Sequence, residues 1–327
     1  MSRVHLFNPD TDYALASGRE YYTAPAEIVR LRRRLALLPA LYATPGDIIL
    51  LADIPDTDIC SLPYADLVAQ KTLRVITPDD IPTHAGMMAE MNPEPWGWNL
   101  SVRRFLLDHI GEMPGMPSAK EIDTLRELAH RRTTISMLQA MSDMLADEIS
   151  LPVETDDTEL VTEMFRRDRR LFFKAPWSSS GRGIMLADDL EERHVLPWVR
   201  GIIRRQGSVM IEKAYQRRLD FATEWICENG SARFLGYSVF NVSRRGKYQN
   251  NFDGSQAELL SEINSVTKQW TPQLLASQRM ALEKIVAPHY SGPLGIDMLV
   301  TDSGNVNPCV EVNLRHTMGM LNLLYHR

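Results

Sequence analysis

The chain has few cysteines and no long apolar segment. Three of its 327 residues are cysteine (Cys60, Cys227 and Cys309), and they lie too far apart to predict a disulfide framework or a metal site. No apolar run approaches the ~20 residues that a helix needs to span a bilayer. The first residues lack the apolar core of a signal peptide. These absences predict a cytoplasmic protein that has no membrane partner.

An excess of basic charge is also missing. The chain carries 36 Lys and Arg against 42 Asp and Glu, giving a net charge of −6. One arginine cluster, at residues 30–34, has roughly helical spacing, and another, at residues 166–170, follows a helix-like stretch. Because acidic residues dominate overall, we interpret each as a solvated helix face or helix end. No nucleic-acid partner is therefore expected. The 327 residues, 44% of them hydrophobic, suffice for one large domain or for two to three ordinary domains that each have a core.

The first third of the chain alternates apolar strand-like runs with helical patterns. This alternation predicts an α/β, Rossmann-like domain over residues 1–117, with a parallel sheet. No glycine fingerprint follows the first run, so a dinucleotide site is not expected there. Asn8, Asp10 and Asp12 follow that run instead, at the edge where open α/β folds bind ligands. Turn chemistry explains these three residues equally well. Residues 112–117, rich in Pro and Gly, read as a linker.

Residues 118–327 predict an α+β domain with antiparallel sheets. Apolar strands are expected over residues 151–154, 171–177 and 209–215, and helices over 158–167, 190–205, 273–287 and 318–325. The runs 221–227 and 232–242 flank a turn signal at Asn229-Gly230, which indicates an antiparallel hairpin. A second hairpin is expected around Gly304.

Lys174 lies inside an apolar strand and is followed by a Ser/Gly loop at residues 178–183. A lysine is costly to bury unpaired, and glycines with serine hydroxyls let the backbone approach an anion. A lysine strand followed by such a loop favours phosphate binding, although it is not a P-loop. A flexible loop beside a snorkelling lysine is the equally weighted alternative.

Polar residues alternate along the last strand-like run. Glu311, Asn313 and Arg315 share one face, because alternate side chains of a strand point the same way. A hairpin centred on Gly304 places Asp297 directly opposite Glu311. Two carboxylates in that position repel each other unless a cation lies between them. Carboxylate and amide oxygens suit Mg²⁺, although a solvated sheet edge would show the same alternation.

The order of these features resembles the ATP-grasp superfamily. Seven features follow one another over residues 118–327. They are a lysine strand, a Ser/Gly loop, a helix, a strand ending Glu-Lys-x-Tyr, a hairpin, a Gly-x-Asp strand and the motif Glu-x-Asn-x-Arg. The last motif is particularly similar to the biotin carboxylase and carbamoyl-phosphate synthetase branch. The resemblance implies a preceding domain over residues 1–117, a lid subdomain over about 133–211 and a C-terminal subdomain over about 212–327.

The resemblance also implies a role for each residue of the site. Catalytic roles fall to Lys174 and Arg315, and Mg²⁺ would be held by Asp297, Glu311 and Asn313. ATP would be bound by Lys174 and by Arg132, Ser179, Ser180, Gly181, Gly183, Glu212, Lys213 and Tyr215. In this scheme the loop residues cover the phosphates, and the Glu212–Tyr215 segment contacts adenine. Arg132 stands where the family usually has a lysine.

The implied activity is an ATP- and Mg²⁺-dependent ligase. It would join a small-molecule or peptide carboxylate to an amine through an acyl phosphate. A kinase of the same fold and a non-catalytic nucleotide-binding module are the alternatives. Asn241, Arg244, Arg245, Lys247 and Asn250 suit an anionic substrate, or form an exposed basic loop. The oligomeric state is left open, with a homodimer as one option.

Overall fold

The computed structural model describes residues 2–178, 181, 183–188, 190–243, 248–268 and 272–325. The chain divides into two compact units, Met1–Arg126 and Glu127–His326. The sequence suggested a boundary at residues 117–118, whereas this division falls inside the next helix, α6 (Ala119–Leu128). Most of α6 belongs to the first unit, where Arg126 Nε donates to the Leu15 carbonyl at 2.6 Å.

The first unit contains a four-stranded parallel sheet, as the alternating pattern predicted. Its strands are β1 (Arg3–Leu6), β2 (Ile48–Leu50), β3 (Arg74–Ile76) and β4 (Asn92–Pro95), in the order β3-β2-β1-β4. β4 was not predicted, because its sequence Asn-Pro-Glu-Pro lacks a strand pattern. It lies at the sheet edge, where proline costs fewer ladder hydrogen bonds.

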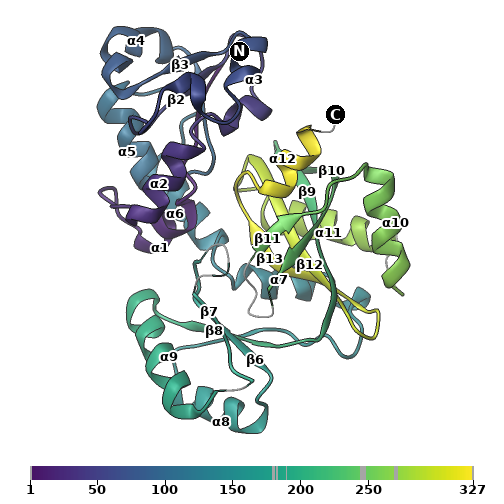
Figure 1. The fold of residues 1–327 in the computed structure, drawn as a ribbon. Helices are drawn as coiled ribbons and strands as arrows, with labels where there is room; N and C mark the ends of the chain where they lie inside the picture. Colours follow the sequence, from purple (N-terminus) through teal and green to yellow (C-terminus); the bar gives the residue numbers. More distant parts are fainter. Residues whose placement is uncertain are drawn as a thin grey trace. The chain divides into compact units, whose positions relative to one another are not determined.

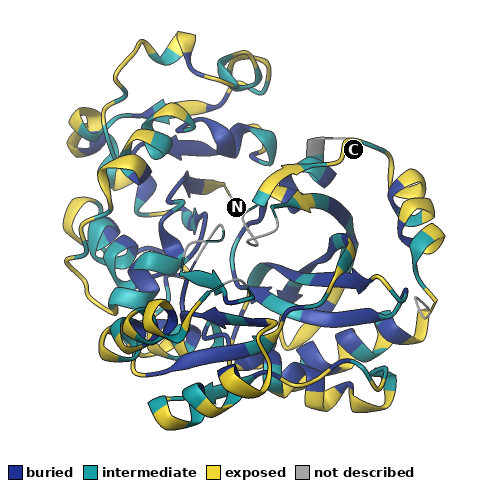
Figure 2. Cartoon of the chain, turned by 60° about the horizontal axis from the view of Figure 1, so that its bottom comes forward, coloured by how far each residue is buried: buried dark blue, intermediate teal, exposed yellow. Residues whose placement is uncertain are grey.

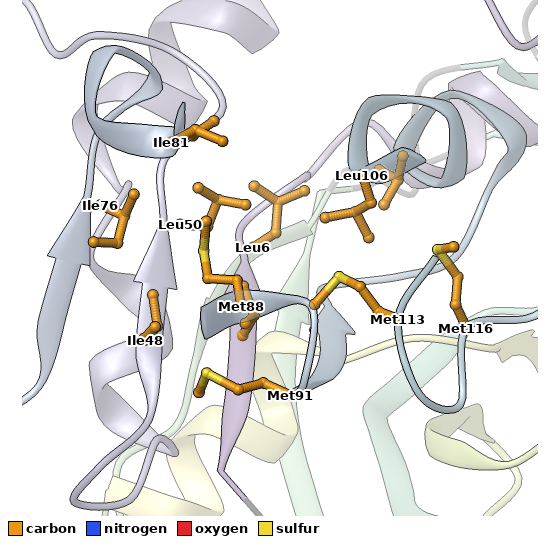
Figure 3. Packing of buried hydrophobic residues seen from close by; sticks show 12 residues of the cluster. Leu6, Ile48, Leu50, Ile76, Ile81, Met88, Met91, Leu106, Met113 and Met116 are labelled. Atoms are coloured by element: carbon orange, nitrogen blue, oxygen red, sulfur yellow. The ribbon is translucent and has the colours of Figure 1, made fainter. Parts of the chain in front are cut away.

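Apolar residues from the strands and helices of the first unit form its core (Figure 3). Leu6, Leu50 and Ile76 come from three neighbouring strands, and Leu106 comes from α5. The helices of this unit besides α6 are α1 (Thr11–Ser17), α2 (Ala26–Arg34), α3 (Ala65–Gln70), α4 (Ile81–Met88) and α5 (Leu100–His109). Asn99 caps α5, since its side chain accepts a hydrogen bond from Val102 N at 2.9 Å.

The second unit contains two antiparallel sheets (Figure 1). The first has the order β5-β8-β6-β7, formed by β5 (Val153–Thr155), β6 (Leu171–Lys174), β7 (Ile184–Leu186) and β8 (Val209–Lys213). Helices α8 (Thr158–Arg167) and α9 (Glu192–Gln206) pack on one face of it. Phe173 of β6 points toward these helices and is fully buried, which leaves Phe172 and Lys174 on the opposite face.

The second sheet has five strands in the order β11-β10-β9-β12-β13. These are β9 (Arg217–Glu228), β10 (Ser231–Val242), β11 (Tyr248–Asn251), β12 (Gly292–Thr301) and β13 (Val306–Asn313). The remaining helices are α7 (Thr133–Ala140), α10 (Gln256–Val266), α11 (Pro272–Ile285) and α12 (Met318–Tyr325). Gln278 of α11 binds Thr223 on one face of the sheet, so Glu224, the next residue of β9, belongs to the other face.

Burial follows this layering. The strands are largely buried, whereas the helices carry both buried and exposed residues (Figure 2). None of the helices in the described part of the chain is both long enough and apolar enough to cross a bilayer.

Candidate functional site

The β12–β13 hairpin pairs Asp297 directly with Glu311, as predicted. The route to this register differs from the expectation. At the hairpin tip Val300 pairs with Val306, which centres the turn on residue 303 rather than on Gly304. A bulge between Asp297 and Leu299 then shifts the register by two residues. Without this bulge Asp297 would face Cys309, so the bulge creates the pair of facing acids.

The two facing carboxylates lie in an environment that penalises their charge. Burial, followed by the nearby Glu311 and Glu224 carboxylates, raises the pKa of Asp297 to about 8, while Arg315 and Asn313 oppose this rise. Glu311 is paired with a buried arginine, Arg131, whose Nη2 lies 2.9 Å from Glu311 Oε1. A cation beside Asp297 would relieve the repulsion that remains.

Asn313 and Arg315 lie on the same face as Glu311. Arg315 Nη2 donates to Asn313 Oδ1 at 2.9 Å, and Arg315 Nη1 donates to the His316 carbonyl at 3.2 Å. The Asn313 side chain is thereby oriented by one charged neighbour while it hydrogen-bonds Asp297. This face therefore combines two carboxylates, one amide and one guanidinium.

Lys174 ends β6 on the face away from the helices and is 5% exposed. Its ammonium group forms a short ion pair with the Glu212 carboxylate of β8. The structure thus supplies the partner that a buried lysine requires. Phe172 packs beside the pair, with Lys174 Nζ 5.9 Å from its ring centroid.

The loop after Lys174 returns directly to the same sheet. Ala175 N donates to the Gly183 carbonyl at 2.7 Å, and Lys174 pairs with Ile184 of β7. Gly183 has a φ of +70°, and a Cβ there would lie 2.9 Å from Ser178 Cβ, so glycine suits both the conformation and the space. Gly181 is described, whereas Ser179 and Ser180 lie outside the described residues.

Lys213 and Tyr215 follow Glu212 at the end of β8. The Tyr215 hydroxyl donates to the Glu148 carbonyl at 3.2 Å and accepts from Ser150 N at 2.8 Å. The Glu148 carboxylate in turn accepts hydrogen bonds from Thr301, Ser303 and Asn305 at the tip of the β12–β13 hairpin. Glu148 therefore ties the end of β8 to the hairpin that carries Asp297 and Glu311.

One pocket in the second unit brings most of these residues together. It encloses about 820 Å³ of empty space, counted out to its open mouth. Its polar lining includes Lys174, Glu212, Lys213, Tyr215, Asp297 and Glu311. Its apolar walls include Phe172, Ile184, Phe240 and Leu299. Apolar walls with a few convergent polar groups are typical of small-molecule sites. Asp220, which pairs with Arg217 at 3.4 Å, also lines this pocket and was not singled out from the sequence.

The two arginines before α7, Arg131 and Arg132, differ in exposure and in the residues that they contact. Arg132, the residue assigned from the resemblance, has a side chain that is 48% exposed and lies 3.6 Å from Glu154. The Arg131 side chain is 3% exposed and donates to Ser178 Oγ at 3.0 Å as well as pairing with Glu311. Arg131 therefore links the loop after Lys174 to the facing acids. Arg132 as a phosphate ligand stays a prediction.

A third acid, Glu224 of β9, was missed from the sequence. It is 1% exposed, and its oxygens accept hydrogen bonds from Ser238 Oγ at 2.9 Å and Thr317 Oγ1 at 2.8 Å. Burial raises the pKa of Glu224 to about 7, against the effect of these hydroxyls and of Arg315. The residue sits inside a predicted strand, where its neighbours gave no signal of a site.

The donor set fits Mg²⁺ better than a metal held by protein side chains alone. Among the described residues, no group of three His, Cys, Asp or Glu side chains comes close enough to hold a metal ion. Asp297, Glu311 and Asn313 offer two carboxylates and one amide. Mg²⁺ commonly binds one or two carboxylates together with substrate phosphates. These residues thus suit a cation that arrives with a phosphate ligand.

The other sequence candidates separate into two groups. In the first unit, Asn8 donates to the Gly97 carbonyl at 2.7 Å and to Thr11 Oγ1 at 3.0 Å, which agrees with turn chemistry. Asp10 is buried 3.8 Å from Arg32, and burial raises its pKa. Asn241 of β10 and Asn250 of β11 are exposed residues of the second unit. Arg244, Arg245 and Lys247 fall outside the described residues.

Comparison with known proteins finds relatives through structure alone. No family model matches the sequence, and no curated protein matches it. The fold is similar to biotin carboxylase of Campylobacter jejuni, with a TM-score of 0.56 and 13% identity over 98% of this chain and 67% of that one. It is also similar to N5-carboxyaminoimidazole synthetase of Staphylococcus aureus bound to ADP, with a TM-score of 0.51 and 10% identity over 97% and 71% of the two chains.

A third similar structure is the L-amino acid ligase of Bacillus licheniformis. Its TM-score is 0.50, with 12% identity over 98% of this chain and 69% of that one. All three are ATP-grasp enzymes, and each likeness extends over both units of the chain. The resemblance seen in the sequence is thereby confirmed at the level of fold: this chain has the ATP-grasp fold.

Proposed function

We propose that the protein is an ATP- and Mg²⁺-dependent ligase that joins a carboxylate to an amine in the cytoplasm. The observation that carries this proposal is the pocket lined both by Lys174 of the first sheet and by Asp297 and Glu311 of the second. The ammonium group of Lys174 suits phosphate oxygens, and the carboxylates of Asp297 and Glu311 suit a metal ion. All three groups face one cavity. Apolar walls beside the Glu212–Tyr215 segment suit a purine base.

The chemistry would proceed in two balanced steps. In the first, a carboxylate oxygen bonds to the γ-phosphorus of ATP, the bond to the bridging oxygen breaks, and ADP leaves. In the second, the amine nitrogen bonds to the carbonyl carbon, phosphate leaves with its oxygen, and the nitrogen loses a proton. Lys174, Arg131 and Arg315 would neutralise and orient the phosphoryl oxygens, because phosphoryl transfer depends on positioning and charge. Mg²⁺, held by Asp297, Glu311 and Asn313, would add Lewis-acid stabilisation of that charge.

The similar structures support the nucleotide and the reaction class. The biotin carboxylase is an ATP-analogue complex, and the carboxyaminoimidazole synthetase binds ADP. The L-amino acid ligase is, by its name, a ligase acting on amino acids. Each is a statement about that protein, and at 10–13% identity the substrates of this chain are part of the proposal.

Two measurements test the proposal. Mg²⁺-ATP at ~100 times its dissociation constant should stabilise the protein by about 2.7 kcal/mol, and Lys174→Ala should lose most of this effect. Repeated turnover, followed as ADP released in excess over enzyme, should then require both a carboxylate and an amine from a panel of metabolites. A stable phosphorylated product without amine would identify a kinase instead. Binding of Mg²⁺-ATP without ADP release across the panel would identify a nucleotide-binding module.

A further inference from the structure

A second pocket continues along the same sheet face from the facing acids toward α12. It encloses about 760 Å³ of empty space and shares Asp297 and Glu311 with the first pocket. Glu224, Arg315 and Thr317 line this second pocket and not the first. Because the first pocket holds the residues assigned to the nucleotide, the second is the place for the other substrates.

Glu224 contributes a buried carboxylate to the wall of the second pocket. Its two direct hydrogen-bond donors, Ser238 and Thr317, are neutral hydroxyls. Within the described parts of the chain, no Lys, Arg or His forms an ion pair with it. A buried carboxylate is costly unless a cation lies against it. Each of its oxygens accepts one hydrogen bond and retains capacity for another donor.

The chain makes room for this carboxylate with two glycines. A Cβ on Gly319 would lie 2.2 Å from Glu224 Oε1, and a Cβ on Gly295 would lie 2.9 Å from Glu224 Oε2. Neither glycine has a positive φ, so the missing side chain provides space rather than a special backbone conformation. Strand β12 and helix α12 are therefore both built around the Glu224 side chain.

The charged side chains that line the second pocket limit the chemical class of ligand that it can bind. Its described lining carries three acids, Glu224, Asp297 and Glu311, and one arginine, Arg315. If Asp297 and Glu311 hold the metal ion, Glu224 is the acid that remains. No third acidic, His or Cys ligand is close enough to complete a metal site among the described residues. A cation at Glu224 must therefore bring its own hydrogen-bond donors.

We propose that Glu224 recognises the amino group of the acceptor substrate, so that the second pocket takes a primary amine presented as an ammonium ion. Because an ammonium nitrogen has no free electron pair, it passes one proton to the Glu224 carboxylate before the neutral amine attacks the carbonyl carbon. The assignment rests on the proposed ligase function and names the substrate class of its second step. An ammonium group offers three N–H donors to the unused lone pairs of Glu224, and charge-assisted hydrogen bonds of this type are strong. Arg315, which lines the same pocket, suits a carboxylate on the same molecule or on its partner substrate.

The test compares two probes of the same shape and different charge. Binding of n-propylammonium chloride and of 1-propanol is measured by ligand-observed NMR on the full chain. The wild-type protein should bind the ammonium probe at least ~10-fold more tightly, which corresponds to about 1.4 kcal/mol. Glu224→Gln should bind both probes equally, whereas Glu224→Asp should keep a smaller preference. Glu228→Gln, which changes an exposed acid on the same strand, is the matched control and should behave as wild type.

The outcomes distinguish the proposed role of Glu224 from the proposed ligase function. No preference for the ammonium probe in the wild type, or the full preference in Glu224→Gln, overturns the role of Glu224. If Glu224→Gln does not fold, an unchanged preference in Glu224→Asp overturns it equally. Mg²⁺-ATP stabilisation is measured on the same samples. A nucleotide effect without an ammonium preference refutes this inference alone, and an ammonium preference without any nucleotide effect refutes the ligase proposal.

Discussion

Replacing Glu224 by Gln should change how the stability of the protein depends on pH. The folded state raises the pKa of this acid from 4.5 to about 7, chiefly by burial. Between these two values the folded protein holds a proton that the unfolded chain has released. The free energy of unfolding of the wild type therefore falls as pH rises through this window, and the loss is complete above the folded pKa. Gln has no such proton to lose.

The displacement from 4.5 to about 7 corresponds to about 3 kcal/mol. At pH 4 both proteins carry a neutral group of the same shape, so their stabilities should be similar. At pH 8 the variant should be about 3 kcal/mol more stable, relative to wild type, than at pH 4. Gln can keep both hydrogen bonds, because Ser238 and Thr317 carry hydroxyls that donate or accept.

The assay is urea unfolding at pH 4 to 8 without nucleotide, followed by circular dichroism and tryptophan fluorescence. Asp297, whose pKa is also raised, contributes to both proteins, and the Gln variant loses the part of that rise which the Glu224 carboxylate causes, so the difference between them reports Glu224 together with its repulsion of Asp297. Glu228→Gln provides the baseline for an exposed acid on β9. Ser238→Ala removes a donor to the charged form, so its pH-dependent loss should extend to higher pH. A difference between Glu224→Gln and wild type that stays constant from pH 4 to 8 refutes the reasoning.

Three further substitutions test the site and its support, and two of them have a matched control. Glu311→Gln keeps the shape but removes one of two facing charges, so Mg²⁺ affinity should fall at least ~10-fold in a metal titration with ATP present. Arg131→Lys should lower stability by about 1–3 kcal/mol in urea unfolding, because lysine cannot reach both Ser178 and Glu311 as a fork. Arg132→Lys, at the more exposed neighbour, should change it by less than ~0.5 kcal/mol. Gly319→Ala should cost about 1–3 kcal/mol in the same assay, since its Cβ would meet Glu224 and Ser238. Gly86→Ala has open space around it and should be neutral or stabilising.

Elements with strong periodicity could be predicted closely from the sequence. The helices Thr158–Arg167 and Met318–Tyr325 occur as expected, and so does the hairpin of β9 and β10. Their patterns bury one face and are bounded by turn residues, so local and tertiary preferences agree. β4 escaped prediction because its alternate prolines disfavour a strand, and only its position at the sheet edge makes it acceptable.

The facing acids could be predicted, whereas the bulge that aligns them was not expected. Counting from Gly304 assumes a regular ladder, while the observed turn is centred one residue earlier and the bulge compensates. The shifted turn and the bulge offset each other, so Asp297 still pairs with Glu311 as expected. Pro308 lies within the bulge and is a local signal that could have indicated it, because proline interrupts a ladder.

Residues whose role depends on tertiary packing could not be found in the same way. Arg131 and Arg132 are adjacent and chemically identical, and only the folded structure shows that Arg131 is buried and Arg132 is not. Glu224 lies in a continuous run of buried residues, Phe221–Trp225, within an ordinary strand. Only the packing shows that the fold accommodates its carboxylate. Gly295 from the neighbouring strand and Gly319 from a helix almost 100 residues later both lie against it.

The same sheet face explains why the free protein should be less stable than its complexes. Asp297, Glu311 and Glu224 project from three adjacent strands into one continuous pocket region, and burial raises the pKa of both Asp297 and Glu224. Such a face costs stability in the absence of ligands, and a sequence selected for stability alone would replace at least one acid. A ligand that brings a cation to the facing pair, and a second that brings one to Glu224, would each recover part of that cost. Because both ligands relieve repulsion among the same three acids, their effects should overlap, so that together they stabilise the protein by more than either does alone but by less than the sum of the two separate effects.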